Sequence, residues 1–191
     1  MDENEKRLAE KIAPEAVLLT LVQAGSFLSA YELIKYDVVE QVRNFFLTGF
    51  DEEGLTYSDA GYQRSVLSLN SKSRFRASAA WLQSMDAITT EEVTKLEEIK
   101  NHRDEIAHEM PRLLVEPDFV VKTQLLAEAA EIVRRLGVFW GTIAVQTDSV
   151  SDPDEVDYEA IKSGSYLLME YLVGLARGVA GILSSEKEPA P

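Results

Sequence analysis

The sequence of 191 residues contains no cysteine, and this absence excludes several kinds of chemistry. Disulfide frameworks, thiolate metal sites and cysteine nucleophiles all need a thiol. Histidine is also scarce, since His102 and His108 are the only two, so a histidine-rich metal site is not expected. We expect the protein to hold neither a metal nor a cofactor.

Glycine and proline are few as well, with 10 and 6 residues, which disfavours collagen-like and turn-dense β architectures. The sequence lacks a glycine-rich phosphate loop, an HExxH pattern and a G-x-S-x-G pattern, so the usual signatures of nucleotide, zinc-protease and serine-hydrolase sites are missing. Hydrophobic residues make up 46% of the chain, a fraction typical of globular proteins. We expect one domain that spans residues 1–191.

No long, purely apolar segment is present. The N-terminal sequence is charged and acidic, unlike a signal peptide. The most apolar run, Ala16–Tyr31, lies between Glu15 and Glu32 and contains several polar residues, so it is too short and too polar to span a bilayer. We interpret it as a helix buried in a core or in a subunit interface, and we expect a cytoplasmic protein without membrane contact.

Apolar residues recur at helical spacing along most of the chain, and no segment shows convincing strand alternation. A first helix is predicted from residue 14 to about residue 47, where Gly49 and the following DEEG turn end it. A second is predicted over about 58–84, with Ser58 or Asp59 as its N-cap. Thr89 opens a third helix with capping-box spacing to a glutamate three residues on, and a fourth helix follows the next Pro-Asp pair.

The last predicted helix follows the acidic loop 151–157, runs to about Leu183 and leaves a frayed polar tail at 184–191. It contains Gly174 and Gly178, each of which costs roughly 1 kcal/mol relative to alanine in a helix interior. This pair predicts the close approach of another helix, either from the same chain or from a second copy. Together the segments predict an all-α, up-and-down bundle of about five helices.

The chain is strongly acidic, with a formal charge of −14, so general binding to nucleic acids is not expected. One segment differs, because residues 60–85 contain no acidic side chain. We call its four cations the basic island: Arg64, Lys72, Arg74 and Arg76. The simpler interpretation is a solvated helix face balanced by acidic neighbours. In the functional interpretation the island binds RNA, and Phe75 or Trp81 either stacks on bases or packs in the core.

An arginine interrupts the apolar face of the helix that opens at Thr89. On an ideal helical wheel, Arg103 lies within about 10° of the centre of the apolar residues of 93–110. An unpaired buried charge costs many kcal/mol, so Arg103 must meet a carboxylate, cap carbonyls or face a wet cleft. His108 lies on the opposite flank, and His102 is predicted to face solvent. The candidate acids for Arg103 are Glu32, Asp37 and Glu170.

Arg103 and His108 are the two kinds of side chain that metal-independent RNA cleavage needs. When the ribose 2′-hydroxyl attacks the phosphate, a base removes its proton, an acid protonates the departing 5′-oxygen, and a cation stabilises the phosphorane. Histidine suits the proton transfers and arginine suits the charge. Side chains five residues apart on an ideal helix point about 140° away from each other, so one site needs a distorted helix or a second copy.

The segment Leu96–Leu114, LEEIKNHRDEIAHEMPRLL, resembles the signature of the HEPN superfamily (the higher eukaryotes and prokaryotes nucleotide-binding domain). That signature is an Arg, a polar residue, about three more residues and a His, and RDEIAH supplies Arg103, Asp104 and His108. The resemblance implies an α-helical bundle that forms a homodimer, with both motifs at a shared cleft. It also implies an endoribonuclease that needs no metal, from a toxin–antitoxin or phage-defence system, with an antitoxin protein as a further partner.

By this resemblance Arg103 stabilises the phosphorane, His108 handles the proton, and Asp104 orients one of them. In the subgroup paired with nucleotidyltransferase antitoxins, a modified Tyr stands two residues after the His, whereas this chain has Met110. The alternative is a non-catalytic HEPN-like protein that binds a nucleotide, RNA or protein partner. A helical bundle in which the motif occurs by chance is the third interpretation.

Overall fold

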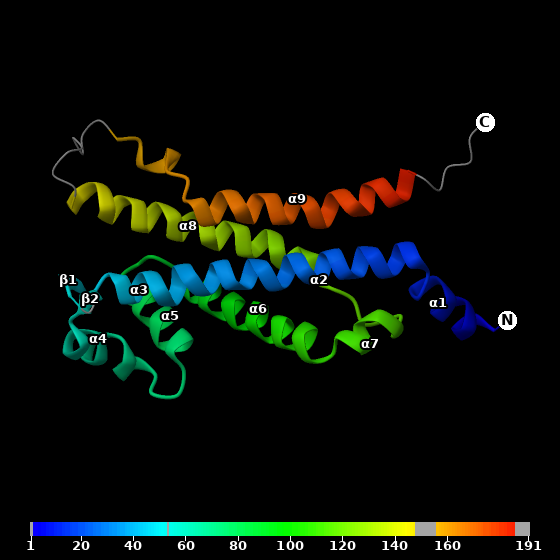
Figure 1. Cartoon of the computed structure of the whole chain (residues 1–191), viewed down its shortest axis with the longest axis horizontal. Coiled ribbons are helices and arrows are strands. Elements are labelled where there is room, and N and C mark those ends of the chain that lie inside the picture. The colour runs from blue at the N-terminus through cyan, green and yellow to red at the C-terminus, as the bar shows by residue number, and fades with distance from the viewer. Residues whose placement is uncertain (1, 53, 148–155, 186–191) are drawn as a thin grey trace.

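Long helices run side by side along the molecule, and a small β-hairpin stands at one end (Figure 1). The computed structural model describes residues 2–52, 54–147 and 156–185. The all-α class predicted from the sequence is confirmed. In chain order the elements are α1 (Glu3–Lys11), α2 (Pro14–Lys35), a π-helical segment (Tyr36–Glu40), α3 (Gln41–Asn44), β1 (Leu47–Asp51), β2 (Gly54–Tyr57), α4 (Asp59–Ser65), a 3-10 turn (Leu67–Leu69), α5 (Arg74–Ser84), α6 (Thr90–His108), α7 (Met110–Val115), α8 (Thr123–Thr147), a second 3-10 turn (Tyr158–Ala160) and α9 (Gly164–Ser185).

The first predicted helix is continuous from Pro14 to Asn44, although its winding changes once. Pro14 occupies the first turn, where backbone N–H groups have no acceptor within the helix, so the N–H that proline lacks is not needed. The segment Tyr36–Glu40 is π-helical and joins α2 to α3 without a break. The observed end at Asn44 lies close to the predicted end at about Leu47.

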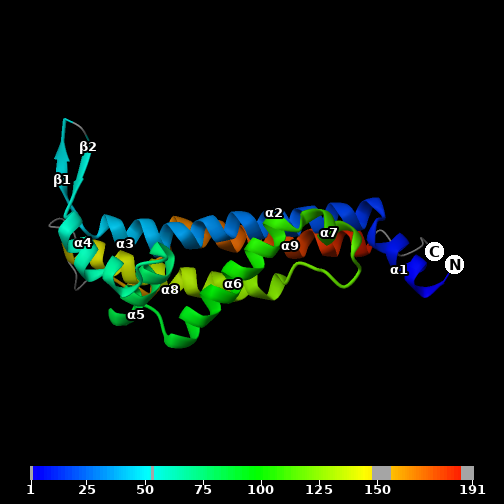
Figure 2. The ribbon, with the colours of Figure 1, turned by 90° about the horizontal axis from the view of Figure 1, so that it is seen from below.

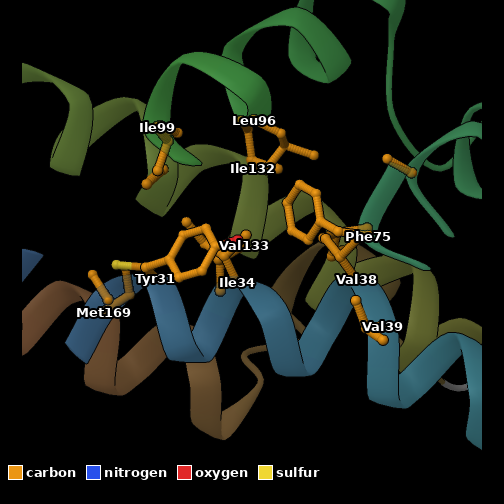
Figure 3. Close-up of a cluster of buried hydrophobic side chains, with 14 of the residues drawn as sticks. Tyr31, Ile34, Val38, Val39, Phe75, Leu96, Ile99, Ile132, Val133 and Met169 are labelled. Atoms are coloured by element: carbon orange, nitrogen blue, oxygen red, sulfur yellow. The ribbon is translucent and has the colours of Figure 1, made fainter. Parts of the chain in front are cut away.

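The core lies where α2, α8 and α9 pack together and α6 covers one side of them (Figures 1 and 3). Helix α2 runs antiparallel to both α6 and α9 (Figure 1). Burial of apolar side chains contributes roughly 25 cal/mol per Å², so this layered contact is the main source of the bundle's stability. The side chains that meet in Figure 3 include Tyr31, Ile34, Val38, Phe75, Leu96, Ile99, Ile132, Val133 and Met169.

The β-hairpin was not predicted. It projects from the end of the bundle (Figure 2), with Phe50 opposite Leu55 and Asp51 opposite Gly54. Phe50 is 83% exposed, and both strands are mostly exposed on their two faces. Because neither face is buried, nothing imposes an alternation of apolar and polar residues, and the strand signal is therefore absent from the sequence.

The second predicted helix, 58–84, is broken into α4, the 3-10 turn and α5. Asn70 explains the break, because its side-chain oxygen accepts hydrogen bonds from the backbone N–H groups of Lys72 and Ser73 at 3.1 and 3.0 Å. Such local bonds offer the backbone an alternative to helix. Ser58 does occupy the N-cap position of α4, but its side chain makes no capping hydrogen bond.

Two of the predicted segments lie partly outside the described residues, namely 151–155 of the acidic loop and 186–191 of the tail. Helix α9 extends through Ser185, so the helix is two residues longer than predicted. The short helices α1 and α7 were not predicted and lie at the end of the bundle opposite the hairpin (Figure 1).

The glycines of α9 are not explained by packing within the chain. A Cβ added at Gly174 or Gly178 would meet no described atom within 4 Å. The predicted close approach of a helix from the same chain is therefore wrong for this pair. The approach of a second copy stays a prediction.

By length and composition alone, the continuous helix Pro14–Asn44 could cross a membrane. Of its most apolar window, 39% is buried inside the protein, as expected for a helix that also serves the core. The absence of membrane contact therefore stays a prediction.

Candidate functional site at the end of helix α6

Helix α6 carries the predicted motif on one uninterrupted stretch of regular helix. Its start is fixed by the predicted capping box, in which Thr89 accepts from the N–H of Glu92 at 3.2 Å and Glu92 accepts from the N–H of Thr89 at 2.8 Å. The helix continues to His108. Arg103 and His108 are thus about 7.5 Å apart along the axis and diverge by about 140° around it, so one chain alone does not bring them together.

The buried face of α6 is rotated by about 35° from its predicted direction. Ala107 is exposed, and Met110 belongs to α7, so neither extends the apolar stripe of α6 as the wheel assumed. Arg103 therefore lies at the edge of the buried face and not at its centre, which corrects the prediction. The residues of α6 that are buried are Leu96, Ile99, His102 and Ile106.

The guanidinium of Arg103 is held from three sides. Its Nη1 donates to Asp104 at 3.0 Å and its Nη2 donates to Glu32 of α2 at 3.3 Å. Its Cζ lies 5.0 Å from the centre of the Tyr31 ring, a cation–π distance. The side chain is 32% exposed, and its Nε is buried without a hydrogen-bond partner among the described residues.

Of the three acids that the sequence offered to Arg103, Glu32 is confirmed as the partner. Asp37 instead accepts from the hydroxyl of Ser165. Glu170 accepts from the hydroxyl of Tyr166, one turn away on α9. The guanidinium of Arg103 is thus held beside α2 by hydrogen bonds but remains partly exposed to solvent.

The electrostatics around Arg103 keep its neighbours in fixed charge states. Burial raises the pKa of Tyr31 to about 12, so the ring facing the guanidinium stays a neutral phenol. The hydrogen bond from Lys100, at 2.7 Å, lowers the pKa of Asp104, and Arg103 lowers it further. Glu32 is also paired with Lys35 at 3.0 Å. The result is a network of alternating charges that holds the guanidinium in one orientation.

His108 is the last residue of α6, and its side chain is exposed. No hydrogen bond or ion pair to it occurs within residues 2–52, 54–147 and 156–185. Its ring nitrogens are therefore open to a ligand, and the prediction that it lies away from the apolar face is confirmed.

The prediction that His102 faces solvent is wrong. Its side chain is 1% exposed, with its ring edge-on to Phe27 at 5.0 Å. Its Nε2 accepts from the backbone N–H of Lys122 at 2.9 Å, so the proton lies on Nδ1, which donates to Glu105 at 2.9 Å. His102 thereby ties α6 to the loop that precedes α8. No apolar periodicity marks it, because His102 lies about 90° from the centre of the apolar stripe that the sequence predicts.

The basic island is split by the structure. Arg76 pairs with Glu97 of α6 through two hydrogen bonds of 2.9 and 2.7 Å, which raise the pKa of Arg76. Lys72 and Arg74 line a cavity of about 200 Å³, and Arg64 donates to the backbone carbonyl of Ala60 in its own helix. Arg76 contacts the N-terminal half of α6, whereas Arg103 and His108 lie in the C-terminal half.

The aromatic residues near the island belong to the core. Phe75 is buried against Tyr31, with ring centres 5.9 Å apart, and Trp81 is stacked on Trp140. They are not available to stack on bases. Phe75, which lies between Arg74 and Arg76 in the sequence, contacts Tyr31, and Tyr31 contacts Arg103. These direct contacts connect α5 to the motif.

No cluster of three or more acidic or histidine side chains that could hold a metal occurs in the part of the chain that the structure describes. The predicted absence of a metal stays a prediction. The candidate groups that the motif supplies are the guanidinium of Arg103 and the imidazole of His108.

Comparisons of the chain with protein-family models, with curated proteins and with solved structures find no match. The resemblance to the HEPN superfamily thus rests on the motif Arg103–His108 and on the all-α class alone.

Proposed function

We propose that the chain is a dimeric, HEPN-like endoribonuclease of a toxin–antitoxin or phage-defence system that cleaves RNA without a metal. The observation that carries this proposal is the state of Arg103. Its guanidinium is fixed by Asp104 and the Tyr31 ring yet remains partly exposed, five residues from an imidazole that has no described partner. A pre-positioned cation and an open histidine are what the transition state requires.

In the proposed reaction the ribose 2′-oxygen attacks phosphorus while the imidazole of one His108 takes its proton. The bond from phosphorus to the 5′-oxygen breaks, and the 5′-oxygen takes a proton from the second His108 of the dimer. Arg103 donates to the non-bridging oxygens as negative charge builds on them. The products are a 2′,3′-cyclic phosphate and a 5′-hydroxyl, and neither an oxidant nor a metal takes part.

Glu32 has a distinct place in this proposal. It holds Arg103 through one hydrogen bond of 3.3 Å, and both side chains are partly exposed, so the pair is weak. A phosphate of RNA would replace Glu32 on Nη2 and leave Asp104 on Nη1. Glu32 is thus expected to compete with substrate.

The test is RNA cleavage by the purified protein in the presence of a metal chelator. Arg103→Ala and His108→Ala are each expected to lower the cleavage rate by about 100-fold or more, because each removes a group used in the transition state. Arg112→Ala is the matched control, since Arg112 is an exposed arginine of the neighbouring helix whose ion pairs among the described residues are with Glu109 and Glu116, and it stacks on Phe119. Cleavage by both motif variants at the parental rate would refute the proposal.

A specific observation also favours the alternative, a non-catalytic HEPN-like protein. Two carboxylates already neutralise Arg103, and Asp104 and Glu32 make its surroundings acidic. Such a site suits a basic protein partner better than RNA. Expression separates the two functions, because a nuclease should slow the growth of its host and His108→Ala should restore growth, whereas the alternative predicts no slowing.

A further inference from the structure

The outer flank of α9 is apolar and exposed. Leu168, Tyr171 and Leu175 follow one another at spacings of three and four, which places them in one row on a helix. Tyr171 is 65% exposed, and both leucines are exposed as well. The inner row, Met169, Leu172 and Ala176, is buried in the core. Helix α9 therefore has two apolar rows, of which the inner one is buried and the outer one is exposed.

The neighbouring flank of α2 has the same character. Leu18 is 53% exposed, and Gly25 and Ser29 are exposed at spacings that continue its row. Helices α2 and α9 pack against each other more extensively than any other pair of described elements, and we take the two exposed rows to border one surface. We call this surface the α2–α9 face: Leu18, Gly25, Ser29, Leu168, Tyr171 and Leu175.

The α2–α9 face carries no charge. Charged residues make up 27% of the chain, yet none occurs between Glu15 and Glu32. Between Gly164 and Gly178, the charged side chains are Glu170 and Arg177, and both line the groove between α8 and α9 on the other flank of α9. An exposed strip of this length without charge marks a contact surface.

Two exposed glycines belong to the same surface, since Gly25 is part of the face and Gly178 follows Tyr171 by seven residues and continues the row on α9; we call the space left by their missing side chains the notch. Asp37 and Ser165 are hydrogen-bonded, and α2 and α9 run antiparallel from that point, so Gly25 and Gly178 both lie about 18–20 Å from it along their helices. A Cβ added at either glycine would meet no described atom within 4 Å. Each glycine disfavours the helix by roughly 1 kcal/mol, and no contact within the described chain accounts for that cost.

We propose that a second copy of the chain docks on the α2–α9 face, with the twofold axis at the notch of Gly25 and Gly178. Two copies that each carry a charge of −14 repel each other, and an uncharged surface avoids adding like charges that face each other across the contact. The pair α2–α9 on its own copy makes an antiparallel four-helix arrangement with an isologous contact. The glycines allow the helices of the two copies to approach closely at the axis.

The size of the face is adequate for a dimer. Residues 16–31 of α2 span about 24 Å, and two helices side by side are about 20 Å wide. The flat footprint is therefore about 500 Å², so two copies would bury about 1,000 Å² in total, which is near the lower limit for a specific interface.

The same axis bears on the candidate site. Because Phe27 contacts His102 and α2 runs antiparallel to α6, Gly25 lies level with the stretch between Arg103 and His108. A twofold axis at that level places Arg103 of one copy and His108 of the other at similar heights along the bundle. This consequence rests on the proposed function, whereas the docking face itself does not.

The first test is sedimentation of the whole chain over a range of concentrations. For the parent we expect a sedimentation mass of twice the 21.3 kDa of one chain. Leu175→Glu should weaken dimerisation by about 100-fold, because the symmetric contact would bury two carboxylates. Leu69→Glu is the matched control, since Leu69 is an exposed leucine of a 3-10 turn away from the face, and it should dimerise like the parent.

A second test uses the absence of cysteine, since a single introduced thiol forms only intermolecular disulfides. Gly25→Cys should oxidise to a covalent dimer much faster than Leu69→Cys. A parent that stays monomeric up to about 100 µM, or equal oxidation of the two variants, would overturn the proposal. Binding of the parent, but not of Leu175→Glu, to phosphatidylcholine vesicles would also overturn it, because the occupant would then be lipid.

These outcomes are separable from those of the RNA assay. A monomer that cleaves RNA through Arg103 and His108 would refute the docking face and leave the chemistry in place. A dimer on this face that leaves RNA intact would refute the nuclease and leave the interface in place.

Discussion

His102 and His108 lie six residues apart on the same helix, and their surroundings are opposite. His102 is buried, its ring contacts Phe27, and both of its nitrogens are hydrogen-bonded. His108 is exposed at the end of α6 and has no hydrogen-bond partner among the described residues. The difference arises from helix geometry, because six residues rotate a side chain by about 240° and carry it from the buried face to solvent.

The comparison separates two uses of one residue type. A buried histidine with both nitrogens engaged holds structure together and has no lone pair left for a substrate. An exposed histidine with open nitrogens adds little to stability and can exchange protons. The largest expected effect on folding therefore belongs to His102, and the largest effect on chemistry belongs to His108.

The first prediction is that His102→Ala lowers the free energy of unfolding by about 2–4 kcal/mol. The substitution leaves a cavity beside Phe27 and removes the acceptor of the Lys122 N–H, and both changes are costly in a core. Urea denaturation followed by circular dichroism measures the change.

The control for this prediction is His108→Ala, which is expected to stay within about 0.5 kcal/mol of the parent. Equal destabilisation by the two substitutions would contradict the assignment of His102 to structure and His108 to the open site.

The sequence did not distinguish the two histidines, because neither lies on the apolar face predicted for α6. On a helical wheel the apolar residues that lie on α6 and contact the core, Val93, Leu96, Ile99 and Ile106, average about 100° away from His102, whether or not Ala107 and Met110 are included. The buried face is rotated because His102 is itself buried and Val93 is only partly buried, and a wheel of apolar residues contains neither fact. The capping box at Thr89, which depends on hydrogen bonds between residues close in the sequence, was predicted correctly.

A second prediction concerns Asp37, a buried polar side chain that is only partly satisfied, in contrast to His102. Its Oδ1 accepts from Ser165 at 3.1 Å, but its Oδ2 has no hydrogen-bond partner among the described residues. Burial raises the pKa of this carboxyl from 3.8 to about 6. Because the folded state binds the proton more tightly, its stabilising contribution is complete below pH 3.8 and is lost as the pH rises through about 6.

The measurement is the free energy of unfolding of the parent and of Asp37→Asn at several pH values. The amide adds a constant offset, because it places an N–H₂ group where Oδ2 has no partner. The difference between the two proteins should nevertheless change by about 2–3 kcal/mol between pH 4 and pH 7, with the parent losing stability relative to the variant. A difference that is independent of pH would show that Asp37 is not held protonated by its burial.

The hairpin and the Arg103 network show a different limit of sequence reasoning. Phe50 and Leu55 pair across two strands whose exposed faces leave no periodic signal. Glu32 and Arg103 are separated by 71 positions in the chain, and their pairing depends on how α2 and α6 are rotated against each other. The sequence could name Glu32 as one of three candidates, but only the packed core selects it.

The smallest expected effect on stability belongs to Glu32→Gln. The pair with Arg103 is partly exposed, with a nitrogen–oxygen distance of 3.3 Å, so its loss should change the free energy of unfolding by less than about 0.5 kcal/mol. The same substitution removes the carboxylate that competes with phosphate at Arg103, and RNA cleavage at low salt should therefore rise by a few-fold. Glu98→Gln is the matched control, since Glu98 pairs with Lys95 on the same helix as Arg103 and does not contact the guanidinium. If Glu32→Gln instead abolished cleavage while Glu98→Gln did not, Glu32 would be needed to position Arg103, and the competition between Glu32 and the phosphate would be disproved.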